Sequence, residues 1–216
     1  MAVVFENTDA YKGRVYPFHV EPVQRDVMGY TLTNVAVGDV VPQGTPLVAN
    51  DNDTNGKKTA VICKYAHITK KTSTTKFELD NIGFLKVGDK IFKSGQDSPT
   101  LSEIESIEGN KITLKAANSQ LAVGDTVLEG KTVTESGESN DPSGDVPVEV
   151  VVPVSIPNRI AARSQKMTAI DKTISATHNA LVIKNVLDYP VEWLNETTFP
   201  GSCLLKGCPL ILFINQ

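Results

Sequence analysis

The stretch LAVGDTVLEG, residues Leu121–Gly130, repeats a pattern that occurs twice earlier in the chain. Val-Gly-Asp also stands in NVAVGDVVPQG, at residues 37–39, and in FLKVGDKIFKSG, at residues 87–89. In each copy an apolar stretch leads into Gly-Asp, and Val or Ile resumes within two residues. Glycine reaches a positive φ without steric cost, and aspartate can bond the backbone just beyond itself. The repeat therefore predicts a structural corner at the entry to a strand, formed by Gly38, Asp39, Gly88, Asp89, Gly124 and Asp125. The copies share no His, Cys or second acid, so they repeat a shape rather than a reaction centre.

The remaining sequence is rich in Val, Ile and Thr, in short apolar or alternating runs separated by Gly, Pro, Asn and Asp, which is typical of strands. We expect strands at Arg14–His19, Val27–Thr33, Pro46–Ala49, Thr59–Tyr65, Thr74–Leu79, Lys90–Lys93, Ser102–Ile107, Lys111–Lys115, Thr126–Leu128, Val148–Val154, Ala180–Val186 and Leu210–Asn215. The segment ESIEGNKITL predicts a hairpin around Glu108-Gly109-Asn110. The best helix candidate is short, Asn158–Lys172, with Pro157 just ahead of it.

This series of short strands separated by turn residues predicts an all-β fold. We expect a β-sandwich or barrel-like domain with an inserted small β-barrel module and little helix. Residues 78–130 form the inserted module, of five or six strands, and residues 131–147 form a polar loop or linker. Residues 1–77 and 148–216 are then the two halves of the other domain, because the tail from 148 has few strands to cover its own core. Three consecutive β modules are the alternative.

Composition excludes several function classes. The net charge of −4 over 216 residues argues against a nucleic-acid partner, which requires a surplus of Lys and Arg. The N-terminus has no signal-peptide pattern, and the longest apolar run, CPLILFI, is too short to span a membrane. The three cysteines, Cys63, Cys203 and Cys208, do not indicate a disulfide framework.

The sequence contains only partial matches to metal-binding and catalytic motifs. Asp51–Gly56, DNDTNG, matches the start of a calcium loop, but its twelfth position is Ile62 instead of Glu. A polar hairpin turn is the better interpretation, with a weak cation site as the alternative. The three histidines, His19, His67 and His178, accompany no nucleophile motif, and the cysteine pair of CLLKGC lacks the further ligands that structural zinc requires. We therefore expect no catalytic, cofactor-binding or metal-binding residues, and no enzyme.

Charge is segregated along the chain. Six lysines and no acid lie between Lys57 and Lys76, whereas six acids and one lysine lie between Glu129 and Glu149. Lysines that protect edge strands explain this pattern; a complementary contact within the chain or between subunits is the alternative. The C-terminal aromatic residues are of types enriched in cores and interfaces alike, and a core is the better interpretation. The candidate interface residues are Lys57, Lys58, Lys64, Lys70, Lys71, Trp193 and Phe213.

Two longer patterns carry a resemblance to a known family. The β modules from FLKVGDKI through SIEGNKITL to LAVGDTV, and the segment GDVVPQGTPLVAND followed by KKTAVICKYAHI, are similar to those of head decoration and head-fibre proteins of tailed bacteriophages. The resemblance covers roughly residues 30–130. It implies a structural virion protein without catalysis, made in the host cytoplasm and located on the capsid surface. The partner would be the major capsid protein, and the chain would form a homo-oligomer, with a trimer favoured.

Two other functions remain open. The first is a carbohydrate- or cell-surface-binding β module, an adhesin or fibre component that uses exposed aromatic residues such as Tyr30, Tyr65 or Trp193. The second is a hydrolase whose site is assembled from scattered residues.

Overall fold

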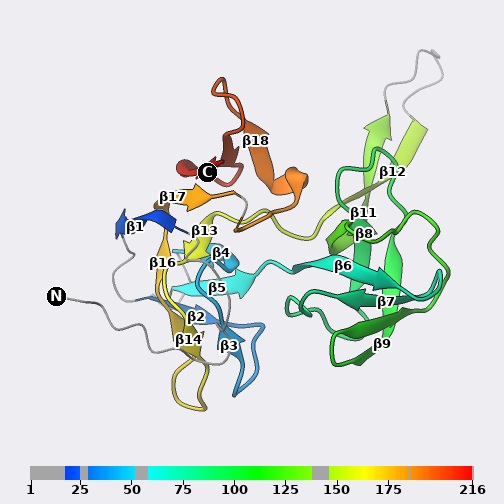
Figure 1. Ribbon diagram of the computed structural model, residues 1–216, viewed down its shortest axis with the longest axis horizontal. Coiled ribbons are helices and arrows are strands. Elements are labelled where there is room, and N and C mark those ends of the chain that lie inside the picture. The colour runs from blue at the N-terminus through cyan, green and yellow to red at the C-terminus, as the bar shows by residue number, and fades with distance from the viewer. Residues whose placement is uncertain (1–17, 25–28, 52–57, 138–145, 185, 216) are drawn as a thin grey trace. The chain divides into compact units, whose positions relative to one another are not determined.

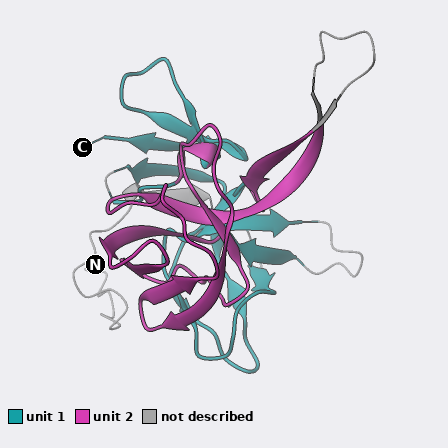
Figure 2. Ribbon diagram, turned by 90° about the vertical axis from the view of Figure 1, so that its right-hand side faces the viewer, with its two compact units in different colours: residues 1–63, 156–189, 193–216 teal, residues 64–155, 190–192 magenta. Residues whose placement is uncertain are grey.

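The computed structural model describes residues 18–24, 29–51, 58–137, 146–184 and 186–215 (Figure 1). These residues are nearly all β, with one three-residue 3₁₀ helix, η2 (Val191–Trp193), and this confirms the all-β prediction. None of the helical residues in these ranges forms a helix of the length and apolarity needed to cross a membrane. The chain divides into two compact units, coloured separately in Figure 2. Unit 1 consists of residues 1–63, 156–189 and 193–216, and unit 2 of residues 64–155 and 190–192.

Unit 2 contains a closed six-stranded barrel. Its strands follow the order β11-β6-β7-β10-β9-β8, and pairing of β8 with β11 closes the ring. The six strands are β6 (Tyr65–Lys71), β7 (Lys76–Leu79), β8 (Lys90–Lys93), β9 (Ser102–Glu108), β10 (Lys111–Leu114) and β11 (Thr126–Gly137). A seventh strand, β12 (Val146–Pro153), pairs only with the later part of β11. The hairpin expected around Gly109 is present, since Lys111 of β10 pairs with Glu108 of β9.

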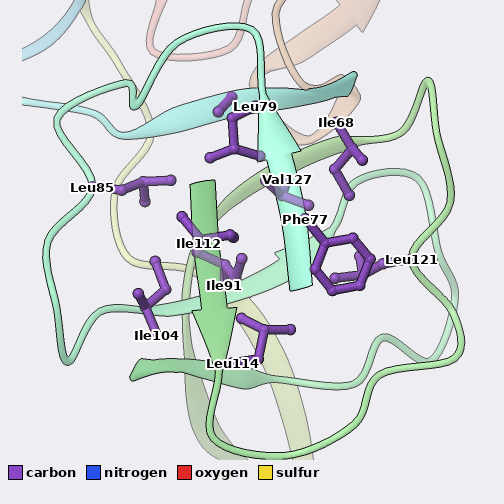
Figure 3. Close-up of a cluster of buried hydrophobic side chains, with 11 residues drawn as sticks. Ile68, Phe77, Leu79, Leu85, Ile91, Ile104, Ile112, Leu114, Leu121 and Val127 are labelled. Carbon is purple, nitrogen blue, oxygen red and sulfur yellow. The ribbon is translucent and has the colours of Figure 1, made fainter. Parts of the chain in front are cut away.

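The barrel encloses its own apolar core, shown in Figure 3. Alternation along each strand turns every second side chain inward. Eleven buried residues form the cluster: Ala66, Ile68, Phe77, Leu79, Leu85, Ile91, Ile104, Ile112, Leu114, Leu121 and Val127. All the strands of the ring contribute to it, so the barrel is a filled core and not a pore.

The barrel is built from two copies of one three-stranded motif. The pairing of Ile68 with Leu79 in β6–β7 is matched by the pairing of Ile104 with Leu114 in β9–β10. Likewise β8 pairs with β9, and β11 with β6, in registers that correspond after a shift of about 36 positions. The β7–β10 and β8–β11 pairs are each centred on one residue pair, Phe77–Ile112 and Phe92–Leu128. The two halves are therefore related by a local twofold axis.

The Gly-Asp corners follow one geometry in all three places. Gly124 has a φ of 89°, and the backbone N–H of Asp125 donates to Ala122 O at 3.2 Å. The Asp125 carboxylate accepts the N–H of Ala122 at 2.7 Å, so aspartate bonds the backbone three residues before itself, and not just beyond it as the sequence suggested. The other copies show the same bonds, from Ala36 N–H to Asp39 at 2.7 Å and from Lys86 N–H to Asp89 at 2.6 Å, with φ of 96° at Gly38 and 89° at Gly88.

Each corner also exchanges two backbone hydrogen bonds with a buried residue of another segment. The Gly124 N–H donates to Ile68 O at 2.8 Å, and the Ile68 N–H donates back to Asp125 O at 2.9 Å. Ile104 makes the same pair of bonds at the corner of residues 87–89, and Met167 does so at residues 37–39. The corners thus fix strand order, while their valines point outward, with Val37, Val87 and Val123 about equally exposed.

Unit 1 contains three sheets. Six strands follow the order β15-β2-β5-β4-β13-β16, five follow β1-β17-β20-β19-β18, and β14 pairs with β3. Their bounds are β1 (Phe18–Gln24), β2 (Tyr30–Leu32), β3 (Val40–Val41), β4 (Pro46–Asn50), β5 (Thr59–Ile62), β13 (Arg159–Ala161), β14 (Gln165–Lys166), β15 (Thr173–Ile174), β16 (Ala176–Thr177), β17 (Asn179–Ile183), β18 (Leu194–Glu196), β19 (Cys203–Leu205) and β20 (Cys208–Ile214).

The aromatic residues of the C-terminal segment lie in the core of unit 1. Trp193 is 1% exposed and Phe213 is fully buried, and the Tyr189 ring lies between them, with ring centroids 5.8 and 5.2 Å away. The Tyr189 hydroxyl donates to Gly44 O at 2.5 Å. Trp193 and Phe213 therefore stabilise this core and do not present an interface, which corrects their place among the candidate interface residues.

Three further expectations differ from the structure. The helix expected at Asn158–Lys172 is absent, because β13 pairs with β4 and β16, and β14 pairs with β3. Of the polar loop expected at residues 131–147, residues 131–137 and 146–147 are strand, because β11 runs to Gly137 and β12 begins at Val146. Residues 138–145 lie outside the described residues. The inserted unit also extends beyond residues 78–130, because β6 and β7 supply two of the six barrel strands and the β11–β12 pair continues to Pro153.

Candidate functional site

The element that departs from the twofold symmetry of the barrel is a two-stranded ribbon. β8 ends at Lys93, whereas its counterpart β11 continues past the barrel to Gly137 and pairs with β12. Both views show this ribbon extending away from the six-stranded ring of unit 2 (Figures 1 and 2). An addition to one half of a symmetric scaffold is not needed to close the barrel, so it is the first place to look for a function.

The ribbon has two faces of different character. Residues directly opposite in an antiparallel pair point to the same face. One face therefore carries the pairs Lys131–Val152, Val133–Val150 and Glu135–Val148. The other face carries Thr132–Val151 and Thr134–Glu149. We call the first the valine face and the second the threonine face.

The valine face is apolar and incompletely covered. Val148 is 49% exposed, and Val133, Val150 and Val152 are partly buried. Val154, 42% exposed, continues the same alternation just beyond β12. Lys131 and Glu135 are exposed at its two ends, and neither takes part in an ion pair with another described residue. An isolated two-stranded ribbon is marginally stable in water, so this face gains most from a partner.

The outer edge of the ribbon is also open. Within the described residues β12 has β11 as its single neighbour, and its sequence from Val148 to Val152 includes one charged residue, Glu149. Edge strands of this kind are templates for pairing with another chain. The ribbon therefore offers two modes of association, by its face and by its edge.

A buried charge cluster anchors the base of the ribbon to the barrel. The Lys64 ammonium donates to Asp89 at 2.7 Å and to Glu129 at 2.9 Å. Burial alone would lower the pKa of Lys64, but the hydrogen bonds and charges of the two carboxylates outweigh it and hold the pKa above its usual value. Lys64 therefore stays charged. It links Asp89, in the Gly-Asp corner before β8, to Glu129, which lies where β11 leaves the ring. One lysine and one acid of the two segregated segments thus meet within the chain.

The other candidate interface lysines are scattered. Lys57 lies outside the described residues, and Lys58 forms an ion pair with Asp51 at 3.7 Å in unit 1. The Lys71 ammonium donates to Leu121 O at 2.5 Å and lies 5.7 Å from the centroid of the Phe77 ring. Lys70 is exposed. Pairing places it with Lys76 and Lys111 on the outer side of β6, β7 and β10, where Glu78 lies opposite both Lys70 and Lys111. We call the three lysines the lysine face.

Residues with catalytic or metal-binding potential do not gather. His67 Nδ1 lies 2.9 Å from Thr126 Oγ1, His178 belongs to unit 1, and the side chain of His19 is outside the description. The three cysteines are buried, and none of them forms a disulfide. The part of the chain that the structure describes contains no group of three His, Cys, Asp or Glu side chains that could hold a metal.

The DNDTNG segment joins two paired strands, with Asn50 of β4 opposite Thr59 of β5. Residues 52–57 lie outside the described residues, but the Asp51 side chain has partners within them. Its carboxylate accepts the Tyr30 hydroxyl at 2.6 Å and Arg159 Nη2 at 3.2 Å. Tyr30 is fully buried, so neither it nor Trp193 is an exposed aromatic residue suited to a carbohydrate site.

The Asp51 contacts lead to a prediction about acid stability. The Tyr30 hydrogen bond, followed by the charges of Arg159 and Lys58, lowers the pKa of Asp51 below its ordinary value of 3.8, against the effect of burial. The stabilisation is therefore complete above pH 3.8 and is lost as the pH falls through the folded pKa. Tyr30→Phe should raise the pKa of Asp51, measured by NMR titration of its carboxyl carbon. Tyr65→Phe is the control and should leave it unchanged; a Tyr30→Phe titration that matches the original chain would contradict the assignment.

Sequence reasoning missed the ribbon because no apolar alternation marks its first strand. The polar composition of EGKTVTESG predicts a loop, and only its threonines, which favour strands, indicate otherwise. A comparison with protein-family models found no match, and searches of curated proteins and of solved structures found none either.

Proposed function

We propose that the chain is a structural virion protein that binds the surface of an assembled phage capsid and stabilises or decorates the shell. The observation that carries the proposal is the ribbon, an arm with an apolar face and an open edge on a barrel that is complete without it. Such elements serve association between chains. The resemblance of residues 30–130 to head decoration and head-fibre proteins supplies the kind of partner, the major capsid protein. A homo-oligomer then repeats each contact by symmetry, and repetition strengthens a weak contact.

The lysine face is the surface proposed to meet the shell. Lys70, Lys76 and Lys111 are exposed and lie on one side of the barrel around Glu78. None of the three forms an ion pair with another described residue. Charges arranged in this way steer encounter and set orientation more than they add affinity. A contact of this type weakens with added salt.

Quantitative mass spectrometry of purified particles, produced from the genome that encodes the chain, tests the proposal. The chain should occur at a fixed high copy number relative to the major capsid protein. Its absence from particles would contradict the proposal. Binding to a glycan array together with absence from particles would favour the carbohydrate- or cell-surface-binding module instead.

The lysine face has its own matched variants. Lys70→Ser, Lys76→Ser and Lys111→Ser together should lower occupancy on the particles, with the largest loss at low salt, because added salt already weakens the contact of the original chain. The control triple Lys90→Ser, Lys166→Ser and Lys206→Ser changes the net charge equally at other exposed positions and should retain occupancy. Equal losses in both triples would show that net charge, and not the lysine face, matters.

A further inference from the structure

We propose that the valine face of the ribbon packs against the valine face of a second copy of this chain, around a twofold axis. The inference goes beyond the proposed capsid binding and does not depend on it. It rests on the order of residues along the ribbon, on their exposure, and on the charges at the two ends of the face.

The charge pattern selects a second copy as the occupant. Along the valine face the order is Lys131, then Val133 with Val150, then Glu135. If two such faces are stacked about a twofold axis through the central valines, Lys131 of each copy lies over Glu135 of the other. Val148 of each copy then lies over Val152 of the other, and Val133 and Val150 meet in the centre. The face is therefore complementary to itself in charge and in apolar character.

The physical gain is also clear. Sheets that pack face to face lie about 10 Å apart, a separation that valine side chains fill from both sides. Two ribbons that are each marginal alone become two packed layers of two strands each. The contact removes the exposed surface of Val148 from water and places both ends of the face in opposite-charge pairs.

A twofold contact of this kind is closed by two copies, since each surface meets its own equivalent. The inference therefore predicts a dimer as the unit in solution, in place of the trimer that the resemblance implies. The threonine face and the outer edge of β12 remain free in that dimer, and so does the lysine face.

Charge exchange gives the sharpest test. Lys131→Glu places glutamate over Glu135 twice in the dimer, and Glu135→Lys places lysine over Lys131 twice. Each single variant should weaken self-association about tenfold or more, since like charges in contact cost at least the equivalent of that factor. The double variant Lys131→Glu with Glu135→Lys restores both pairs and should return to near the original dissociation constant. Sedimentation velocity over a concentration series measures the monomer–dimer equilibrium.

Two further variants complete the design. Glu149→Lys makes the same charge change as Glu135→Lys on the threonine face of the same ribbon, and should leave the dimer unchanged. Val133→Thr with Val150→Thr keeps the shape and strand preference of the ribbon while making its centre polar, and should weaken the dimer. A monomeric or trimeric original chain, failure of the double variant to restore association, or an equal loss with Glu149→Lys would each overturn the inference. Particle occupancy measured on the same variants separates this outcome from that of the proposed function.

Discussion

Phe77→Ala is expected to lower the free energy of unfolding of the barrel unit by about 3–5 kcal/mol, the usual cost of deleting a buried phenylalanine side chain. Phe77 is 2% exposed and belongs to the core cluster of the barrel. It lies at the centre of the β7–β10 pairing, opposite Ile112. The hydrogen-bonded ring of strands resists collapse around the cavity, so the upper part of this range is expected.

The measurement must report on unit 2, because the single tryptophan of the chain, Trp193, belongs to unit 1. Amide hydrogen exchange in β6 to β11, followed in increasing denaturant, gives the stability of the barrel directly. Val123→Ala, at an exposed corner position of the same barrel, is the control and should change stability by less than about 0.5 kcal/mol. Equal protection in Phe77→Ala and in the original chain would show that this ring does not support the core.

The all-β class could be predicted because apolar and polar residues alternate along a strand, and this alternation is visible in the sequence without knowing which strands pair. The strand at Lys90–Lys93 follows from this signal, and the hairpin at residues 102–114 follows from it together with the turn at Gly109-Asn110. The segment at 158–172 shows the opposite case, since local periodicity there suggested a helix. Pairing with β4, β16 and β3 outweighs that weak preference, because helix propensity is easily overridden by tertiary contacts.

The internal duplication was visible only in part. The Val-Gly-Asp copies at residues 87–89 and 123–125 marked one point of the repeat, but the hairpins before them differ in sequence and in length. Ile68 and Ile104 occupy equivalent places, since each bonds the Gly-Asp corner that leads into the neighbouring strand, and the sequence does not show which residue bonds which corner. The third corner, at residues 37–39, belongs to unit 1 and has its own partner, Met167.

The candidate site was the least predictable part. A valine-rich strand at 146–153 can be expected from its composition, yet its face depends on the register with β11. That register pairs Val150 with Val133 and leaves Lys131 and Glu135 at the ends. The location of the aromatic residues could not be predicted either, because protein cores and interfaces are enriched in the same residue types. Only the fold places Trp193 in a core.

Gly83→Ala is expected to cost the barrel about 3 kcal/mol or more, through a clash added to backbone strain. Gly83 has a φ of 54°, and a Cβ placed on it would lie 1.9 Å from Tyr65 O. Because the obstacle is backbone at the start of β6, no change of side-chain rotamer can relieve it. Either the loop before Leu85 or the first residues of β6 must move, and both belong to the closed ring.

Gly124→Ala separates the two causes, because Gly124 shares a positive φ of 89° but a Cβ there would meet no atom within 4 Å. Its cost should be the conformational term alone, about 1–2 kcal/mol for a residue other than glycine in this region. Hydrogen exchange of the barrel amides measures both variants on one scale. A larger loss in Gly83→Ala than in Gly124→Ala assigns the difference to the contact with Tyr65. Equal losses would mean that the strand can yield at Tyr65 and that strain at φ alone governs both positions.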